Sequence, residues 1–184
     1  DWSSDVCSSD LDEQIKAVSF GSMTNIQQDT CGTNYTDYTS IIPPVKVNRG
    51  GTYPFSVKTD ECDGAPYYYN GLAIYIDFNR DGDWNDAGEQ AYLSSQLSLS
   101  PNTRRGTVTI PSGASVGQTR MRIAVIESTA PPACITNNFY GEVEDYLIEI
   151  GSGGITNQWS TGTIVSSWIN VTPAISTTYT RSEE

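Results

Sequence analysis

Short stretches of alternating hydrophobic and polar residues recur along the chain and predict β-strands. In "TRMRIAVIE" (119–127), Met121, Ile123 and Val125 alternate with the residues between them, a period of two that is typical of a strand with one buried face. The i, i+3, i+4 periodicity of helices is hard to find. We therefore expect seven main strands, at residues 15–20, 52–59, 71–78, 90–95, 105–110, 119–127 and 142–150.

Proline, glycine, asparagine and aspartate separate these stretches, which indicates short strands joined by turns. This pattern predicts an all-β fold, an antiparallel β-sandwich of the jelly-roll or Ig-like type. A chain of 184 residues is long enough for one principal domain. Binding sites in such a fold are expected on the loops at the ends of the sheets.

The two ends of the chain differ from its middle. Residues 1–11, "DWSSDVCSSDL", resemble a translated sequencing adapter, and residues 181–184, "RSEE", resemble the start of its companion string. We therefore expect both segments to be non-native and the chain to be a metagenomic fragment of a longer protein, with its main domain at 12–150. Residues 151–154, "GSGG", are typical of a flexible linker. The following 155–180 resemble part of an Ig-like repeat of bacterial adhesins, with a disordered linker as the alternative.

Charge and composition exclude several classes of function. The chain has 22 acidic and 10 basic residues and a net charge of −12, which argues against nucleic acid as a partner. It contains no histidine, which excludes Ser-His-Asp and Cys-His catalysis and zinc bound by histidine. It also lacks an apolar run long enough to span a bilayer, so we expect no membrane insertion.

The cysteines are too widely spaced for a typical zinc or redox motif. Cys7 lies in the segment expected to be non-native, and Cys31, Cys62 and Cys134 form no C-x-x-C pair. We favour one disulfide between Cys62 and Cys134, since both lie in loops rich in proline and glycine beside predicted core strands. The alternative is that all three cysteines are reduced.

The stretch "YIDFNRDGDWNDAGE" (75–89) concentrates acidic residues after a predicted strand. It matches the first half of a calcium loop, D-x-D/N-x-D/N-G, in which alternate oxygen ligands wrap the ion. The match then departs, because position 12 is Gly88, so this is not an EF-hand. We predict a Ca²⁺ site with the ligands Asp77, Asn79, Asp81, Asp83 and Glu89, and with Asp86, Glu144 and Asp145 as weaker candidates.

Two alternatives for this loop remain open. Asp, Asn and Gly are ordinary turn formers, so the loop could be a solvated hairpin that binds nothing. Paired carboxylates also cleave sugars in glycosidases, but such pairs need a walled pocket, and here the acids cluster on one loop.

A second informative stretch is "YGEVEDYLIEI" (140–150). Together with "IYIDFNRDGDWNDAGE" (74–89) and "YTDYT" (35–39), it resembles the GEVED domain over roughly residues 12–150. That resemblance implies a non-catalytic β-sandwich module of a secreted or surface-anchored bacterial protein, located beside metallopeptidase domains or adhesive repeats. Neighbouring domains of the same chain are then the expected partners.

The acids of this stretch require partners if the strand is buried. Glu142, Glu144 and Asp145 would be costly to bury alone and should meet a cation. Either calcium held by the acidic loop or the arginines of the preceding strand, Arg120 and Arg122, could supply the charge.

The aromatic residues Tyr67, Tyr68 and Tyr69, with Trp84, could form a platform for sugar rings. Core packing and a tyrosine-rich loop form the simpler interpretation, because consecutive residues of a strand point to opposite faces.

We therefore expect a calcium-stabilised accessory or adhesion module, without catalytic activity, from an exported bacterial multidomain protein. The alternatives are a carbohydrate-binding module that uses Tyr67–Tyr69 and Trp84, or a glycosidase fragment. Surface glycans or proteins are further candidate partners.

Overall fold

The computed structural model describes residues 8–10, 12–27, 33–62, 64–134, 136–153, 157–159, 162–163 and 181–183. The chain divides into two units, Asp1–Ser152 and Gly153–Glu184. All the regular structure of the described residues is β, and none of it is a helix that could cross a membrane. The second unit contributes a small sheet in the order β14-β13-β15, made of β13 (Asn157–Trp159), β14 (Gly162–Thr163) and β15 (Arg181–Glu183).

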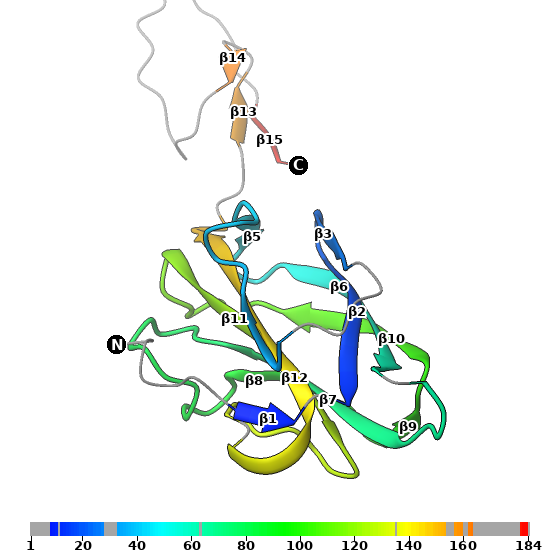
Figure 1. The fold of residues 1–184 in the computed structure, drawn as a ribbon. Coiled ribbons are helices and arrows are strands. Elements are labelled where there is room, and N and C mark those ends of the chain that lie inside the picture. Colours follow the sequence, from blue (N-terminus) through cyan, green and yellow to red (C-terminus); the bar gives the residue numbers. More distant parts are fainter. Residues whose placement is uncertain are drawn as a thin grey trace, which may run out of the picture. The chain divides into compact units, whose positions relative to one another are not determined.

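The first unit is a sandwich of two sheets (Figure 1). The larger sheet has the central order β1-β12-β11-β7-β8, formed by β1 (Ser8–Asp10), β12 (Thr136–Gly151), β11 (Gly117–Glu127), β7 (Tyr69–Ile76) and β8 (Gln90–Leu93). Three short strands join it, β4 (Tyr35–Asp37) and β5 (Val45–Asn48) on β12, and β9 (Ser98–Leu99) on β7. The smaller sheet has the order β10-β6-β2-β3, formed by β10 (Asn102–Thr109), β6 (Thr52–Glu61), β2 (Glu13–Phe20) and β3 (Met23–Ile26).

The predicted all-β sandwich and its seven main strands are confirmed, with shifted ends. The strand predicted at 142–150 begins earlier, at Thr136, and the one predicted at 71–78 ends at Ile76, where the acidic loop starts. The short strands β3, β4, β5 and β9 were not predicted, because two to four residues are too few for a periodic pattern.

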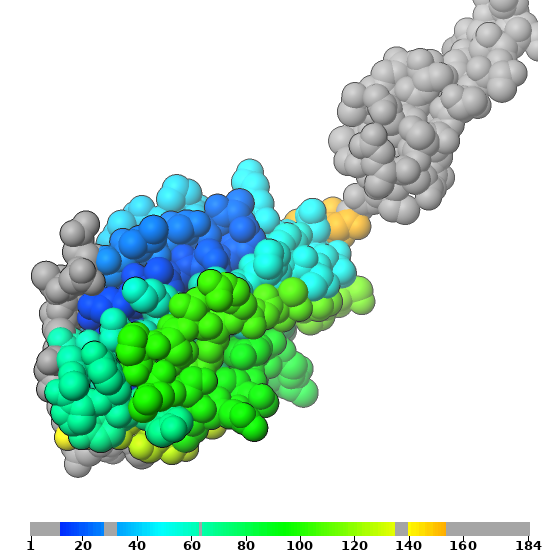
Figure 2. All heavy atoms as spheres, turned by 90° about the vertical axis from the view of Figure 1, so that its right-hand side faces the viewer, coloured from blue at the N-terminus to red at the C-terminus, as the bar shows by residue number. Residues whose placement is uncertain are grey.

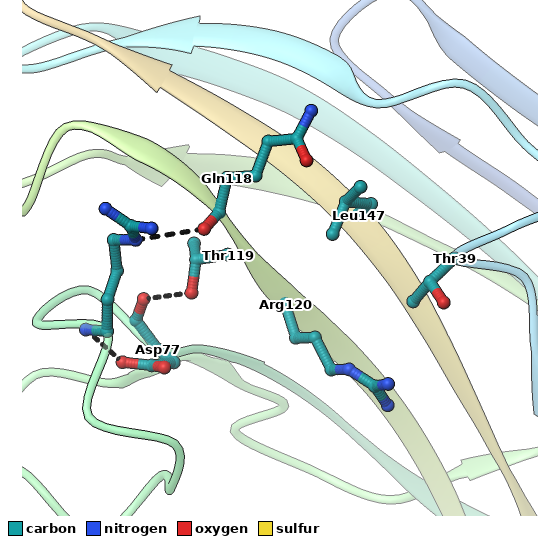
Figure 3. A pocket seen from close by; sticks show the side chains of 7 residues that line it. Thr39, Asp77, Gln118, Thr119, Arg120 and Leu147 are labelled. Carbon is teal, nitrogen blue, oxygen red and sulfur yellow. Dashed lines mark hydrogen bonds between the residues drawn. The ribbon is translucent and has the colours of Figure 1, made fainter. Parts of the chain in front are cut away.

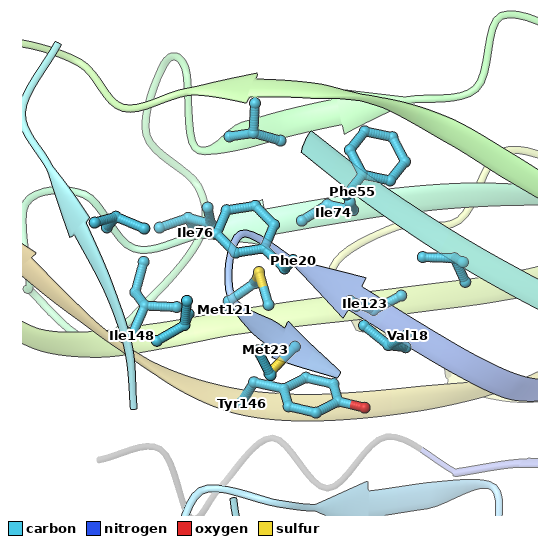
Figure 4. Packing of buried hydrophobic residues seen from close by; sticks show 14 of the residues in the cluster. Val18, Phe20, Met23, Phe55, Ile74, Ile76, Met121, Ile123, Tyr146 and Ile148 are labelled. Carbon is cyan, nitrogen blue, oxygen red and sulfur yellow. The ribbon is translucent and has the colours of Figure 1, made fainter. Parts of the chain in front are cut away.

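The hydrophobic core fills the space between the two sheets. Figure 4 shows Phe20 of β2 and Phe55 of β6 among side chains of the larger sheet, including Ile74, Met121 and Tyr146. In the space-filling view, blue, cyan and green segments adjoin one another on one face of the domain (Figure 2). The core positions of the larger sheet follow the period-two pattern that the sequence predicted.

The outer face of the larger sheet is also partly covered. Ala124, Ile126 and Val143 form a second apolar cluster on that face, and Ala73, Tyr75 and Trp84 form a third. The prediction of one buried face for residues 119–127 is therefore incomplete. Even Arg122, which alternates with the core residues, is fully buried.

Gly141, at the start of the G-E-V-E-D stretch, lies against the neighbouring strand. A Cβ atom at this position would meet the carbonyl oxygen of Val125 at 2.2 Å, too close for any side chain. Backbone atoms of β11 occupy this space, so they cannot move aside as a flexible side chain could.

We expect Gly141→Ala to lower the free energy of unfolding by about 2 kcal/mol, because overpacking strains the β11–β12 pair. Chemical denaturation followed by tryptophan fluorescence measures this change. Gly113→Ala is the matched control, since no atom lies within 4 Å of its Cβ position. Equal stability of the two variants would contradict the close-packing role of Gly141.

Candidate functional site

The acidic loop, residues 77–89, connects β7 to β8. Its base is closed by hydrogen bonds from the Ile76 amide to the Glu89 carbonyl (2.9 Å) and from the Glu89 amide to the Asp86 carbonyl (3.1 Å). The Asp77 amide donates to the Arg120 carbonyl of β11 (3.2 Å). The loop is therefore tied to the larger sheet where it begins and closed on itself where it ends.

The acids at the two ends of the loop hold its backbone. Asp77 is fully buried, and its carboxylate accepts hydrogen bonds from the amides of Arg80 (2.5 Å) and Gly82 (3.2 Å). Glu89 is 2% exposed, and its Oε1 accepts from the amides of Phe78 (2.9 Å) and Asn79 (3.4 Å). Burial raises the pKa of Glu89. Its second oxygen, Oε2, has no hydrogen-bond partner, which leaves one buried acceptor unused.

The acids at the tip of the loop converge on one another. Oxygen atoms of Asp81, Asp83 and Asp86 all lie within 4.8 Å of one another. The Asn79 amide nitrogen bridges two of them, donating to Asp81 Oδ2 (2.9 Å) and to Asp86 Oδ2 (2.6 Å). The Asn79 hydrogen bond lowers the pKa of Asp81, which favours its charged form.

These oxygens suit a hard cation such as Ca²⁺, which prefers carboxylate and amide ligands in a flexible shell. Of the five predicted main ligands, Asp81 and Asp83 lie in the converging group, together with Asp86, which was predicted as a weaker candidate. Asn79 contacts that group. Asp81 and Asp83 also accept hydrogen bonds from the amides of Asp83 (3.2 Å) and Asn85 (2.8 Å), while Asp77 and Glu89 bind backbone amides at the base.

A polar pocket of about 290 Å³ adjoins the base of the loop (Figure 3). Its lining includes Arg80 and Gln118. Arg80 donates a hydrogen bond from Nε to the backbone carbonyl of Gln118 (3.0 Å). Thr119 donates from its hydroxyl to the Asp77 carbonyl (2.7 Å). Arg80, Gln118 and Thr119 were not predicted as site residues, because they belong to no recognisable ligand motif.

Asp145, the last residue of the G-E-V-E-D stretch, forms a buried ion pair. Arg122 donates from Nε to Asp145 Oδ1 (2.7 Å) and from Nη2 to Oδ2 (2.8 Å), a two-pronged contact between fully buried residues. Arg120 Nη1 (3.0 Å) and the Tyr35 hydroxyl (3.0 Å) also donate to Oδ2. Of the two partners considered for Asp145, the structure therefore supplies the arginines.

Arg122 also contacts the acidic loop. Its guanidinium lies 4.0 Å from the centre of the Trp84 ring, and its Nη1 donates to the Ala133 carbonyl (3.0 Å). Trp84 belongs to the acidic loop and is only 7% exposed. One arginine therefore joins the acidic loop to the G-E-V-E-D strand.

Glu142 and Glu144 point to the opposite face of β12, into the sandwich, and meet neither arginine. Glu142 accepts a hydrogen bond from the Ile15 amide (2.6 Å), at the bulge in β2 where the register with β6 shifts between Ile15 and Ala17. Glu144 accepts from the Tyr146 hydroxyl (2.7 Å) and from the Gln27 side chain. Burial raises the pKa of Glu142 to about 7, and burial beside Glu142 raises that of Glu144.

These contacts correct one expectation and leave another without support. Glu142 and Glu144 were expected to meet calcium or the arginines of β11. Instead, Glu142 accepts from the Ile15 amide and interacts with the charge of Lys16, and Glu144 accepts from the Tyr146 hydroxyl. Glu144 and Asp145, the weaker calcium candidates, both have protein partners outside the acidic loop.

The tyrosines and the tryptophan of the predicted aromatic platform do not share one exposed surface. Tyr67, Tyr68 and Tyr69 are 45%, 41% and 57% exposed and so offer ring faces to solvent. Trp84 packs on Arg122 and is not part of that surface. Cys62 and Cys134 are both disulfide-bonded, and their pairing with each other stays a prediction.

We expect Asp145→Ala to lower the free energy of unfolding by about 4 kcal/mol, because it leaves the buried Arg122 charge without its partner. Urea denaturation measures the loss. Asp37→Ala is the matched control, since Asp37 lies 3.4 Å from Arg120 and its side chain is 38% exposed; that variant should lose about 1 kcal/mol or less. Similar losses in both variants would refute the central role of the Arg122–Asp145 pair.

Comparison with known proteins agrees with the two motifs. The family model of the GEVED domain matches residues 71–149, which run from β7 through the acidic loop into β12. No curated protein matches the chain.

Solved structures that match include two β domains. One is the CARDB domain of a Pyrococcus furiosus protein, which is 14% identical in sequence. The match covers 59% of this chain and 88% of the CARDB chain, with a TM-score of 0.37. The other is a chitin binding domain from Burkholderia pseudomallei, which is 11% identical in sequence. The match covers 61% of this chain and 59% of the other chain, with a TM-score of 0.30. The family match is the informative one: residues 71–149 of this chain match the model of the GEVED domain.

Proposed function

We propose that this chain is a calcium-stabilised accessory module of an exported bacterial multidomain protein, without catalytic activity of its own. The observation that carries the proposal is the convergence of Asp81, Asp83 and Asp86 at the tip of the acidic loop. Three carboxylates this close repel one another unless a cation lies among them.

The residues that would hold the ion are those at the tip. Asp81, Asp83 and Asp86 would supply carboxylate oxygens. Asn79 would supply its amide oxygen, which now accepts from the Asp81 amide (2.9 Å), after a half-turn that releases the hydrogen bonds its nitrogen donates. Asp77 and Glu89 would keep the loop closed through the backbone amides that they already bind. Calcium would supply charge compensation here and no chemistry.

The bound ion would also stabilise the sandwich. An ordered loop places Trp84 over Arg122, and Arg122 binds Asp145 in the middle of β12. Binding to the folded state alone raises stability in proportion to the logarithm of ligand concentration, so the module would be most stable where calcium is plentiful, as it is outside cells.

An accessory role agrees with the chemistry of the side chains. The chain has no histidine, and its clustered loop carboxylates are exposed or half-buried rather than enclosed in a walled pocket. In the adjoining pocket, Arg80 donates hydrogen bonds to backbone carbonyl oxygens, and Arg120 forms ion pairs with Asp37 and Asp145. These features favour a binding or structural module over a glycosidase.

We expect millimolar calcium to raise the melting temperature of the full chain by about 5–10 °C over its value in chelator, which corresponds to about 2–3 kcal/mol. Asp81→Asn should lose more than half of that rise, because it removes one charge from the converging group. Differential scanning calorimetry measures both. Glu149→Gln, which removes an acid of β12 outside the loop, should keep the full rise. An undiminished rise in Asp81→Asn would exclude the loop as the calcium site.

Sugar binding by the exposed tyrosines is a second candidate function. Tyr69 pairs with Leu99 across β7 and β9, and Leu99 is 44% exposed, so aromatic and aliphatic side chains adjoin on this surface. Apolar faces of sugar rings stack on such surfaces.

We expect any glycan binding by the full chain to fall at least tenfold in the double variant Tyr67→Ser, Tyr69→Ser, since both lose exposed rings. A glycan array followed by titration calorimetry measures it. Tyr140→Ser is the control, because Tyr140 is 46% exposed but lies on β12. The sugar-binding hypothesis is wrong if the array shows no binding, or if binding survives the double change.

A further inference from the structure

A second group of oxygen atoms lies at the other end of β7 from the acidic loop. Glu13 of β2 and Glu61 of β6 are direct partners in the smaller sheet. Asn70 of β7 and Glu127 of β11 are direct partners in the larger sheet. All four continue the inward-facing series of their strands, whose neighbouring members Ile15, Leu72 and Val125 belong to the core between the sheets.

Three side chains of this group are almost completely buried and incompletely bonded. Glu13 and Asn70 are 0% exposed and Glu61 is 4% exposed. Glu61 Oε1 accepts from the Tyr68 amide (2.8 Å), and Asn70 Nδ2 donates to Ser100 Oγ (2.6 Å) and lies 3.5 Å from Glu13 Oε1. Glu13 Oε2, Glu61 Oε2 and Asn70 Oδ1 have no hydrogen-bond partner. Three buried oxygens from three strands thus accept no hydrogen bond from another group, although the Glu13 and Glu61 side chains lie close enough to share a proton.

The charges around this group are unbalanced. Burial, Glu61, Glu127 and Asp12 together raise the pKa of Glu13 to about 8. A nearby cation, Arg104, is 8% exposed. It directs Nη2 to the Asn70 carbonyl and interacts with Glu13 through its charge, without a hydrogen bond to either glutamate among the described residues. Like charges directly opposite in a sheet destabilise it, and burial increases the cost. A further positive charge, either a proton or a metal ion, must offset them.

We propose that Glu13, Glu61 and Asn70 form a second cation site, which takes Ca²⁺ between the two sheets. The free atoms are two carboxylate oxygens and one amide oxygen, the donors that calcium prefers. Glu127 lies opposite Asn70 and can complete the charge balance. Calcium fits better than Mg²⁺, which loses its water reluctantly and usually keeps several water ligands.

The amide of Asn70 makes this group more than a cluster of acids. Asn70 carries no charge, is fully buried beside Glu13, and has a side-chain carbonyl oxygen without a hydrogen-bond partner. A half-turn of the amide exchanges its two ends and places Oδ1 beside Glu13, while Ser100 can donate to it. The three free oxygens would then face one ion.

This site stands independently of the acidic loop, because the two lie at opposite ends of β7 and share no residue. The competing explanation is a proton shared between Glu13 and Glu61, which would also offset the repulsion. The two explanations differ in whether removing one carboxylate changes the number of bound ions.

Isothermal titration calorimetry of the full chain with CaCl₂ tests the site. Wild-type protein should bind two ions per chain, and Glu13→Gln and Glu61→Gln should each bind one ion fewer. Glu149→Gln, a matched change of an acid on β12 outside both sites, should keep both ions, and Asp81→Asn should keep the interior ion. In chelator, Glu13→Gln should melt at or above the wild-type temperature, because repulsion is removed.

Unchanged stoichiometry in both Glu13→Gln and Glu61→Gln would overturn this proposal in favour of the shared proton. A single ion that is lost in Asp81→Asn but retained in Glu13→Gln would overturn it while supporting the loop. A single ion that is retained in Asp81→Asn but lost in Glu13→Gln would support the interior site and overturn the calcium site in the acidic loop. No bound ion would overturn both. If one of the two interior variants fails to fold by circular dichroism, the other decides.

Discussion

The buried ion pair between Arg122 and Asp145 is the interaction on which the two sequence motifs depend. The edge of the guanidinium binds the carboxylate of the G-E-V-E-D strand, and its face packs on Trp84 of the acidic loop. A buried charge needs a partner with good geometry, so Asp145 cannot be replaced by an arbitrary polar residue. The acidic loop and β12 must therefore both be in their native positions for Arg122 to make its contacts, although sixty residues separate Trp84 from Asp145.

Period-two alternation was enough to predict the main strands and the sandwich, but not the outer face of the larger sheet. Met121, Ile123 and Val125 were correctly predicted to face the core. Arg122 looked like an outward residue, and it does point outward, but a loop that returns over the sheet buries it. Alternation reports which residues share a face of a strand. It carries no information about what later packs on that face.

The acidic loop shows a similar limit. Its composition predicted a group of oxygen ligands, and the structure does bring Asp81, Asp83 and Asp86 together. Spacing alone could not assign Asp77 and Glu89 to the backbone amides, because that depends on the turn at Arg80, where φ is 66°. Glu142 likewise binds a bulge in β2 that is 127 residues away in sequence, and no local pattern signals that contact. Long-range backbone geometry decides which acids remain free.

The two proposed ions would act differently because of where they lie along β7. An ion at the loop tip orders one connection and, through Trp84, supports the outer face of a single sheet. An ion among Glu13, Glu61 and Asn70 has ligands in both sheets, so it offsets repulsion that would otherwise separate them. Loss of the first would loosen the acidic loop and lower the stability of the sandwich through the contact of Trp84 with Arg122. Loss of the second would remove a link across the core, and the cooperative unfolding of the whole sandwich would register it.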